Sequence, residues 1–333
     1  MKKFLNYIST LLIFVFIVSV QGQNFFYKDP LSLPEGLEEI YLKGLNFLCQ
    51  RQNNDGSWKL SSYGQTPGVV GLCVLAFRAH GDDPENGLYS TNIKKALNFI
   101  LQNMNKENGY IGNSMYNHAF ATLAIAEAYG VVMDDRLGPA LEKAVQLILS
   151  AQKRNQFGGW RYSPDSNDAD TTVTGACMVA LFAAANAGIK VPDESIQKGL
   201  EFYKSCQDAS GGIGYTNSQG PNTIRTGIAS LVWALAKQKN SNEYKKTTEF
   251  LEGRGPESIE EAYLFYGLYY LSQTFFHYKP IYWERWNSSN IKYLKSIQSE
   301  DGSWNSNFGP EFSTACALLS LALNYRYLPI YER

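Results

Sequence analysis

One phrase recurs along this chain: a lysine, a small residue and a run of apolar residues, followed by a glutamine and a Gly-x-aromatic turn. The clearest copy runs from Lys43 to Trp58, and varied copies cover Lys95 to Tyr110, Lys143 to Trp160, Lys198 to Tyr215 and Tyr293 to Trp304. Self-similarity at a spacing of tens of residues is the signature of a repeat architecture. The phrase therefore constrains the fold before any local pattern does.

Each copy predicts two helices joined by a turn. Apolar residues follow each anchor residue at three- and four-residue spacing, as one face of an amphipathic helix requires; the anchors are Gly44, Ala96, Ala144, Gly199, Thr247 and Asn290. A second stretch, apolar all round as in a helix buried on both sides, surrounds a recurring small residue, namely Gly71, Ala119, Gly175, Gly227, Ala262 and Ala315. The terminal repeats are as regular as the middle ones, whereas an open solenoid needs polar caps. We therefore predict an all-α fold, an (α/α)6 toroid of six helical hairpins.

The Gln-x-x-x-Gly-x-Trp element resembles the QW motif of squalene–hopene cyclases and related terpenoid cyclases, and the repeat of protein prenyltransferase β-subunits. The resemblance covers the chain from about Leu42 to Leu323 and implies an (α/α)6 barrel. It also implies that the motif residues are structural, and they are Gln52, Trp58, Gln152, Trp160, Gln207, Tyr215, Gln298 and Trp304. The fifth repeat departs from the pattern, because Gly255 stands where the glutamine belongs and the Gly-x-Trp is missing.

The N-terminal segment predicts export. Residues 1–22 contain two lysines, an apolar run from Leu11 to Val20 and a small-residue cleavage site ending at Gly22, which together indicate a signal peptide. An uncleaved N-terminal anchor is the alternative. No later segment is apolar for long enough to span a bilayer. We expect a secreted or periplasmic protein whose residues 23–333 form a single toroid domain with no integral membrane span after cleavage.

Charge and cysteine content exclude several partners. The net charge is −1 and there is no basic run, which argues against nucleic acid. The five cysteines are widely spaced and lie in stretches that read as helical, so we expect buried free thiols rather than a disulfide framework. Zinc-dependent prenyltransferases use an Asp-x-Cys pair, and complement-like thioester domains use Gly-Cys-Gly-Glu-Gln; neither occurs here. We therefore expect no metal and no cofactor.

The third repeat has the longest turn, and the turn is acidic. Its segment Asp168-Ala169-Asp170-Thr171-Thr172 resembles the DxDD(T) motif of class II terpenoid cyclases, with Thr171 replacing the last aspartate. The resemblance implies that Asp170 is the general acid, kept protonated in an apolar cavity with help from neighbouring Asp168. Two departures weaken the transfer: the third aspartate is absent, and the larger cyclases build their site between two barrels. The alternatives are ligand binding and a helix N-cap, since aspartate before an apolar helix accepts bonds from free backbone N–H groups.

Further candidates lie near the starts of the apolar helices. One polar column, immediately before each small residue, contains His118, Thr174, Thr226, Glu261 and Thr314. If this column faces the lumen, His118 and Glu261 bind ligand together with Arg225, whose charge needs a partner such as Asp170 or Glu261. Trp160 and Tyr162 are candidate stacking platforms, and Tyr266 belongs to an aromatic fifth repeat whose rings suit carbocations or sugars. The plainer alternatives are a core histidine and aromatic packing.

Three classes of function remain. The first is a protein that binds an apolar, isoprenoid-like ligand in the barrel, with acid-initiated cyclase or isomerase chemistry at Asp170. The second is a secreted carbohydrate-active barrel that uses carboxylates such as Asp168, Asp170, Glu260 or Glu261 on an oligosaccharide. The third is a non-catalytic scaffold that binds a partner over its rim. The repeat motif favours the first class, and export favours the other two.

Overall fold

The computed structural model describes residues 33–332, and the predicted signal peptide lies outside them. The chain from Pro34 onwards forms one compact unit. Twelve α-helices make up this unit, and the described residues contain isolated β-bridges but no β-strand. None of the described helices is long and apolar enough to cross a membrane.

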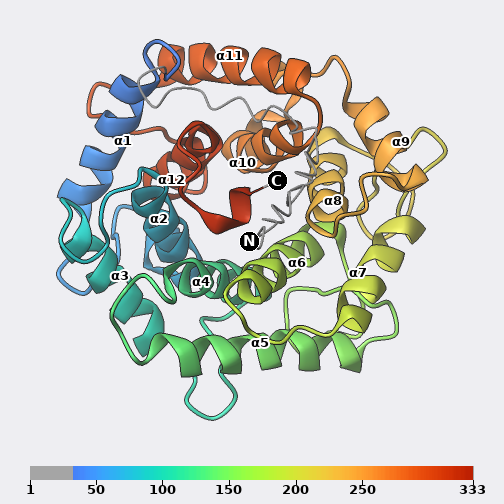
Figure 1. The fold of residues 1–333 in the computed structure, drawn as a ribbon, viewed down its shortest axis with the longest axis horizontal. Helices are drawn as coiled ribbons and strands as arrows, with labels where there is room; N and C mark the ends of the chain where they lie inside the picture. The colour runs from blue at the N-terminus through green and yellow to red at the C-terminus, as the bar shows by residue number, and fades with distance from the viewer. Residues whose placement is uncertain (1–32, 333) are drawn as a thin grey trace, which may run out of the picture. The chain divides into compact units, whose positions relative to one another are not determined.

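The helices of this unit form two concentric rings (Figure 1). The inner ring consists of α2 (Pro67–Ala79), α4 (Met115–Ala128), α6 (Thr171–Asn186), α8 (Thr223–Leu235), α10 (Leu264–His277) and α12 (Pro310–Leu321). The outer ring consists of α1 (Leu37–Arg51), α3 (Ser90–Gln102), α5 (Leu137–Arg154), α7 (Asp193–Ser205), α9 (Asn242–Leu251) and α11 (Pro280–Ile297). Outer and inner helices alternate along the chain, and α12 returns to pack against α2. The predicted all-α toroid of six hairpins is therefore confirmed.

The inner helices are buried on all sides, as their composition predicted. Every residue of α2 is buried. A Cβ atom on Gly71 would lie 2.8 Å from the backbone oxygen of Phe120 in α4, so only glycine permits this approach of the two helices. Gly71 thus sets the spacing of α2 and α4. Ala262, the small residue predicted for the fifth inner helix, instead lies exposed in η3 (Glu261–Tyr263), before α10 begins.

In four repeats a glutamine joins one outer helix to the next. The Nε2 of Gln52 donates to the carbonyl of Gly56 in its own turn, at 3.1 Å, and to that of Asn92 in α3, at 3.0 Å. The glutamines that bridge in the same way are Gln152 (to Gly158 and Ser195), Gln207 (to Gly211 and Glu243) and Gln298 (to Gly302 and Ile40). Because Ile40 lies in α1, the last glutamine links the end of the ring to its beginning. We call this paired hydrogen bond the glutamine staple.

Tryptophans of the turns pack behind the staples. The indole N–H groups of Trp58, Trp160 and Trp304 donate to carbonyls of the preceding outer helix, at 2.8–2.9 Å. The fourth repeat corrects the prediction for Tyr215. Ile213 occupies the buried position there, because its backbone N–H bonds to Thr226 just as the N–H of Trp160 bonds to Thr174. Tyr215 lies two residues further on, where its ring is partly exposed.

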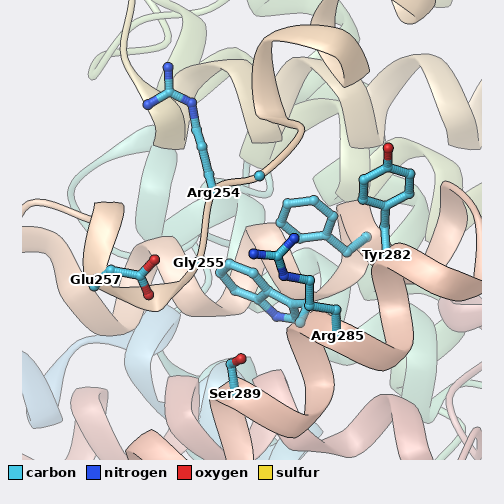
Figure 2. Close-up of a pocket in the computed structure, with 9 residues that line it drawn as sticks. Arg254, Gly255, Glu257, Tyr282, Arg285 and Ser289 are labelled. Atoms are coloured by element: carbon cyan, nitrogen blue, oxygen red, sulfur yellow. The ribbon is translucent and has the colours of Figure 1, made fainter.

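The fifth repeat has no staple. A small pocket opens instead between Gly255, four residues after the end of α9, and Trp286 in α11 (Figure 2). The second repeat also lacks the glutamine, but Met104 stands in its place. The fifth repeat is therefore the one in which the position carries no side chain at all.

The C-terminal segment lies inside the ring (Figure 1). Its short helix η5 (Pro329–Tyr331) packs against α6, and the backbone N–H of Ile330 donates to Glu127 at the end of α4, at 3.2 Å. Leu328, Ile330 and Tyr331 are each at most 3% exposed. The chain therefore occupies the ring's centre at the C-terminal end of the inner helices, which directs attention to the opposite end.

All five cysteines are free, as predicted, and four of them are buried. No cluster of His, Cys, Asp and Glu side chains suited to a metal ion is present among residues 33–332.

Candidate functional site

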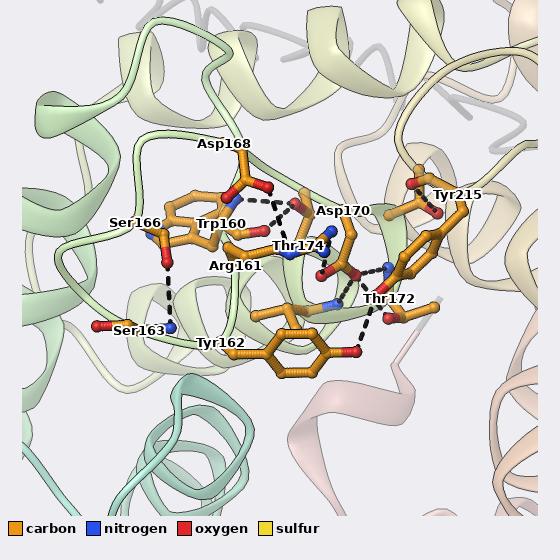
Figure 3. Close-up of polar contacts among 12 residues, drawn as sticks. Trp160, Arg161, Tyr162, Ser163, Ser166, Asp168, Asp170, Thr172, Thr174 and Tyr215 are labelled. Atoms are coloured by element: carbon orange, nitrogen blue, oxygen red, sulfur yellow. Dashed lines mark hydrogen bonds and ion pairs between the residues drawn. The ribbon is translucent and has the colours of Figure 1, made fainter.

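The long turn of the third repeat rests on a fixed base. The backbone N–H of Asp170 donates to the carbonyl of Trp160 at 2.9 Å, so the two ends of the turn are paired. The Trp160 side chain is buried beneath them. The residues between the two ends reach outward and carry Arg161, Tyr162 and Asp168 (Figure 3).

Asp170 is the N-cap of α6. Its Oδ1 atom accepts hydrogen bonds from the backbone N–H groups of Thr172 and Val173, at 2.8 and 2.9 Å, and from the Thr172 hydroxyl at 2.6 Å. Such a cap satisfies N–H groups that have no partner within the helix. The capping role considered from the sequence is thus real, but it occupies only one oxygen of the carboxyl group.

Neighbouring repeats cap the same position with neutral residues. Ser114 caps α4 and Asn222 caps α8, each by accepting one backbone N–H bond. Both stand five residues before the small residue of their repeat, as Asp170 does. A carboxyl group is therefore more than the cap requires, and what distinguishes Asp170 is its second oxygen.

The second oxygen, Oδ2, is buried and forms no hydrogen bond. Its nearest charged neighbour is the Nη1 atom of Arg161, at 3.7 Å, which is also buried without a hydrogen-bond partner. Burial raises the pKa of Asp170 above its ordinary value, against the opposing effects of the capping hydrogen bonds and the Arg161 charge. An added proton would reside on Oδ2, because Oδ1 already accepts three bonds.

Arg161 stands between the two aspartates of the turn. Its Nε lies 3.5 Å from Oδ2 of Asp168, and its guanidinium group stacks over the rings of Tyr162 and Tyr215, at 5.3 and 5.2 Å. The Asp168 side chain is half-exposed. Asp168 thus acts on Asp170 through a shared guanidinium group, and not as the directly facing carboxylate that the sequence suggested.

A chain of tyrosines extends from this turn into the fifth repeat. The hydroxyl groups of Tyr162 and Tyr215 are 2.8 Å apart, and those of Tyr116 and Tyr266 are 3.4 Å apart. The Tyr116 ring lies 6.0 Å from that of Tyr162, which joins the two pairs. Burial raises the pKa of Tyr116 and Tyr266 far above the ordinary value, so both remain neutral phenols. The structure therefore brings the predicted residues Tyr162 and Tyr266 into one cluster with Asp170.

Arg161, Tyr116 and Tyr215 are the members of this cluster that the sequence did not mark as ligand-binding candidates. Tyr116 lies two residues before His118, in the first turn of α4. Tyr215 was assigned to the buried turn position, but it is displaced from it by two residues. The spacing from glutamine to aromatic residue is six for Gln52 and Gln298 but eight for Gln152, so the sequence pattern alone did not decide between Ile213 and Tyr215.

The prediction that His118 binds ligand required the polar column to face the lumen, and it does not. The Nδ1 of His118 accepts the backbone N–H of Ile111 at 3.1 Å, and its Nε2 donates to the carbonyl of Ala144 at 2.9 Å. Burial lowers the pKa of His118 to about 4, so the ring is neutral. The threonines of the column likewise accept N–H groups of their own turns in the third, fourth and sixth repeats. In the second, third, fourth and sixth repeats the column therefore fastens the turn to its inner helix.

Arg225 lies at the edge of the cluster, beside Tyr215. Arg225 donates to the backbone carbonyls of Ile213 and Gly220, stacks 5.9 Å from Tyr215 and makes no ion pair with a described residue. Burial lowers its pKa. Glu261 is exposed in the short helix η3 (Glu261–Tyr263), so neither Asp170 nor Glu261 is the partner of Arg225 that the sequence proposed.

Solved structures whose fold is similar to this chain include two groups of enzymes. An inactive variant of an α-1,6-mannanase from Salegentibacter sp. HEL1_6, in complex with α-1,6-mannotetrose, is similar with a TM-score of 0.63 and 10% identity, over 86% of this chain and 99% of the mannanase. The type II terpene cyclase MstE from Scytonema, in complex with its product merosterolic acid A, is similar with a TM-score of 0.62 and 13% identity, over 88% of this chain and 98% of the cyclase. The fold is an α/α toroid. A family 76 glycoside hydrolase from a bovine Bacteroides thetaiotaomicron strain matches with a TM-score of 0.62 and 11% identity, over 87% of this chain and 77% of the hydrolase.

No protein-family model matches the chain. At these identities the likeness to the solved structures shows the fold alone, so the toroid is shared by proteins that act on quite different substrates. The chemistry of this chain has to be argued from its own residues.

Proposed function

We propose that the protein is exported and that it binds an apolar, isoprenoid-like ligand at the N-terminal end of α6, where Asp170 protonates it. The proposal rests on the different environments of the two oxygens of the Asp170 carboxyl group. Oδ1 caps α6, while Oδ2 is buried, makes no hydrogen bond and belongs to a group whose pKa is raised. An acid that must protonate an alkene has to hold its proton without a competing acceptor.

The chemistry that fits this group is an isomerisation. The Oδ2 proton moves to one carbon of a C=C bond, whose π electrons form the new C–H bond, and the other carbon becomes a cation. A second C=C bond of the same ligand attacks the cation and closes a ring. Loss of a proton to the Asp170 carboxylate then restores the acid, so no oxidant or co-reactant is needed.

The surroundings support both charged intermediates. The carboxylate left after proton transfer keeps its three capping hydrogen bonds and gains an attractive neighbour in Arg161, 3.7 Å away. A cation near the cluster faces the rings of Tyr116, Tyr162 and Tyr266, whose quadrupoles attract positive charge. Because Oδ2 is buried beneath Arg161, ligand access requires the Arg161 side chain to turn aside, which makes it a positioning residue.

A specific observation also favours a second candidate, the binding or cleavage of an oligosaccharide. Tyr162 is 47% exposed, and the half-exposed carboxylate of Asp168 lies on the same turn, so the turn offers a stacking platform and a polar group. The Salegentibacter mannanase binds α-1,6-mannotetrose on the same fold. Glycosidases need two carboxyl groups about 5–10 Å apart on either side of the bond. Asp168 and Asp170 lie on one turn and share one guanidinium group, which argues for the single-acid mechanism.

The test follows deuterium from solvent into product. The purified protein is incubated in D2O with a panel of linear polyprenyl alcohols and, separately, with α-1,6-mannotetrose, and products are analysed by mass spectrometry. We expect a cyclised isomer that carries one deuterium with the wild type and none with Asp170→Asn. Asparagine caps α8 at the equivalent position, so this variant keeps the cap and loses only the acid. Mannose release without polyprenyl turnover would instead establish the second candidate and overturn the first.

A further inference from the structure

The pocket of the fifth repeat occupies the place of a missing staple. Each of the four staples joins two positions: a glutamine eight residues after its own anchor, and a carbonyl four residues before the next anchor, as in Gln52 and Asn92. The same count from Thr247 and Asn290 gives Gly255 and Trp286. Both residues line the pocket. The cavity is thus the volume that a glutamine side chain fills in the other four repeats.

The lining supplies partners of both signs. Glu257 and Arg285 lie on opposite sides of the pocket, with Ser289 below them (Figure 2). The stacked rings of Phe275 and Trp286 also line it and form its aromatic floor. Arg254 lines the rim, but its side chain points away and donates to the Phe250 carbonyl and the Thr223 hydroxyl (Figure 2). The pocket therefore presents one acidic and one basic side chain to whatever enters.

We infer that this pocket binds a primary carboxamide, the terminal group of a glutamine or asparagine side chain or of a small amide. The NH2 group of the ligand takes over the donors of the missing glutamine, toward the Trp286 carbonyl and the Glu257 carboxylate. The carbonyl oxygen accepts from Arg285. In the stapled repeats the amide oxygen is also used, because Gln52 accepts from Asn92 at 2.8 Å and Gln152 accepts from the Ser195 hydroxyl.

Size and charge exclude other ligand classes. The cavity volume of ≈ 60 Å³ is far below the roughly 300 Å³ at which drug-sized ligand pockets begin, so a sugar ring or an isoprenoid does not fit. A carboxylate would face Glu257, and an ammonium group would face Arg285, whereas a neutral amide matches both with its own dipole. The flat amide also packs against the aromatic floor.

Gly255 is not required by the backbone. Its φ of −120° and ψ of −176° are extended values that any residue adopts. A Cβ atom at this position would meet only the carboxylate of Glu257, at 2.4 Å, which is the far end of a flexible side chain. The full-length protein can therefore carry its own amide at this position, and Gly255→Gln serves as the internally filled variant.

The binding test uses propionamide, which is the glutamine side chain without its backbone. Propionamide is titrated into the wild type while the indole N–H signal of Trp286 is followed by NMR, after assignment with Trp286→Phe. We expect saturable binding at millimolar concentration, with at least tenfold weaker binding of propionate and of butan-2-one, which lack one half of the amide. Gly255→Gln should abolish the shift.

Two further experiments test the source of the amide and the role of the missing glutamine. N-acetyl-glutamine-methylamide should shift the same signal if the pocket admits a side chain of a polypeptide, and only propionamide should do so if its source is a small molecule. Gln298→Gly opens the equivalent slot between α11 and α1, and propionamide should raise the Tm of that variant more than that of the wild type. Equal binding of propionate and propionamide, or an unchanged propionamide shift in Gly255→Gln, would overturn the inference.

Discussion

The third and fifth repeats break the same pattern in opposite ways. The third keeps its staple and its buried tryptophan and adds residues between them and the inner helix, so that Arg161 and Tyr162 project from a fixed base. The fifth loses the staple and adds nothing in its place, which leaves a pocket between Gly255 and Trp286. An insertion beyond an intact staple creates a loop that carries charged and aromatic side chains, whereas the loss of a staple creates a cavity.

The two breaks also differ in what holds them. Backbone hydrogen bonds from Asp170 to Trp160 and from Thr171 to Tyr215, both 2.9 Å long, fix the third turn to its own tryptophan and to the next turn. The pocket of the fifth repeat lies at the surface, where its Glu257 and Arg285 side chains are exposed. We therefore expect substitutions at the base of the third turn to destabilise the protein, whereas a glutamine introduced at Gly255 should not.

Removing the tryptophan beneath the third turn should have the largest effect. Trp160→Ala deletes a buried ring and its hydrogen bond to Ile148, and we expect a loss of about 3–5 kcal/mol in the free energy of unfolding. Urea denaturation followed by circular dichroism measures this loss. Ile213→Ala in the fourth repeat is the matched control, since it leaves a smaller cavity at the equivalent position; an equal or larger loss there would contradict the special role of Trp160.

Removing the staple of the third repeat should have the next largest effect. Gln152→Ala leaves the carbonyls of Gly158 and Ser195 and the Ser195 hydroxyl without their partner, which should lower the free energy of unfolding by about 1–3 kcal/mol. The turnover that depends on Asp170 should fall with it, because the base of the turn loosens. Gln152→Met provides the control, since Met104 replaces the glutamine in the second repeat. Full activity with Gln152→Ala would show that the site does not depend on the staple.

The acid of the third turn predicts a pH dependence of stability. Burial raises the pKa of Asp170 in the folded protein above its value in the unfolded chain, so the folded state binds more protons between these two values. The stabilisation is complete below a pH of about 4 and is lost as the pH rises through the raised pKa. Asp170→Asn should flatten this part of the profile, as measured by Tm from pH 4 to pH 8, whereas Asn222→Asp should introduce a new slope only if its cap is equally buried.

Much of the fold was predictable because repetition makes each local pattern count several times. The spacing of Gly71, Ala119 and Gly175 marks where inner helices approach, and the structure places a backbone oxygen 2.8 Å from the missing Cβ of Gly71. The third turn was identified as the place of interest because it is the longest break in that repetition.

The details of the site were less predictable, for a physical reason. Sequence shows which residues are near a helix start but not which way they point: His118 and the threonines of its column face their own turns, although their spacing was compatible with the lumen. The partition of the Asp170 carboxyl group between a cap and an unpaired oxygen depends on Arg161, whose position is set by stacking on Tyr215 from the next repeat. A sequence pattern within one repeat does not indicate which residues of the next repeat it will contact.

Repair of the fifth repeat should have the smallest effect but the opposite sign. Gly255→Gln supplies the two donors that the other staples use and removes the backbone freedom of a glycine from the unfolded chain, so we expect a gain of about 1 kcal/mol in the free energy of unfolding. Gly255→Leu fills the same pocket without donors and is the matched control. An equal gain with leucine would mean that filled volume, and not the paired hydrogen bond, is what the fifth repeat lacks; a gain with glutamine alone would show that the staple itself stabilises each joint of the ring.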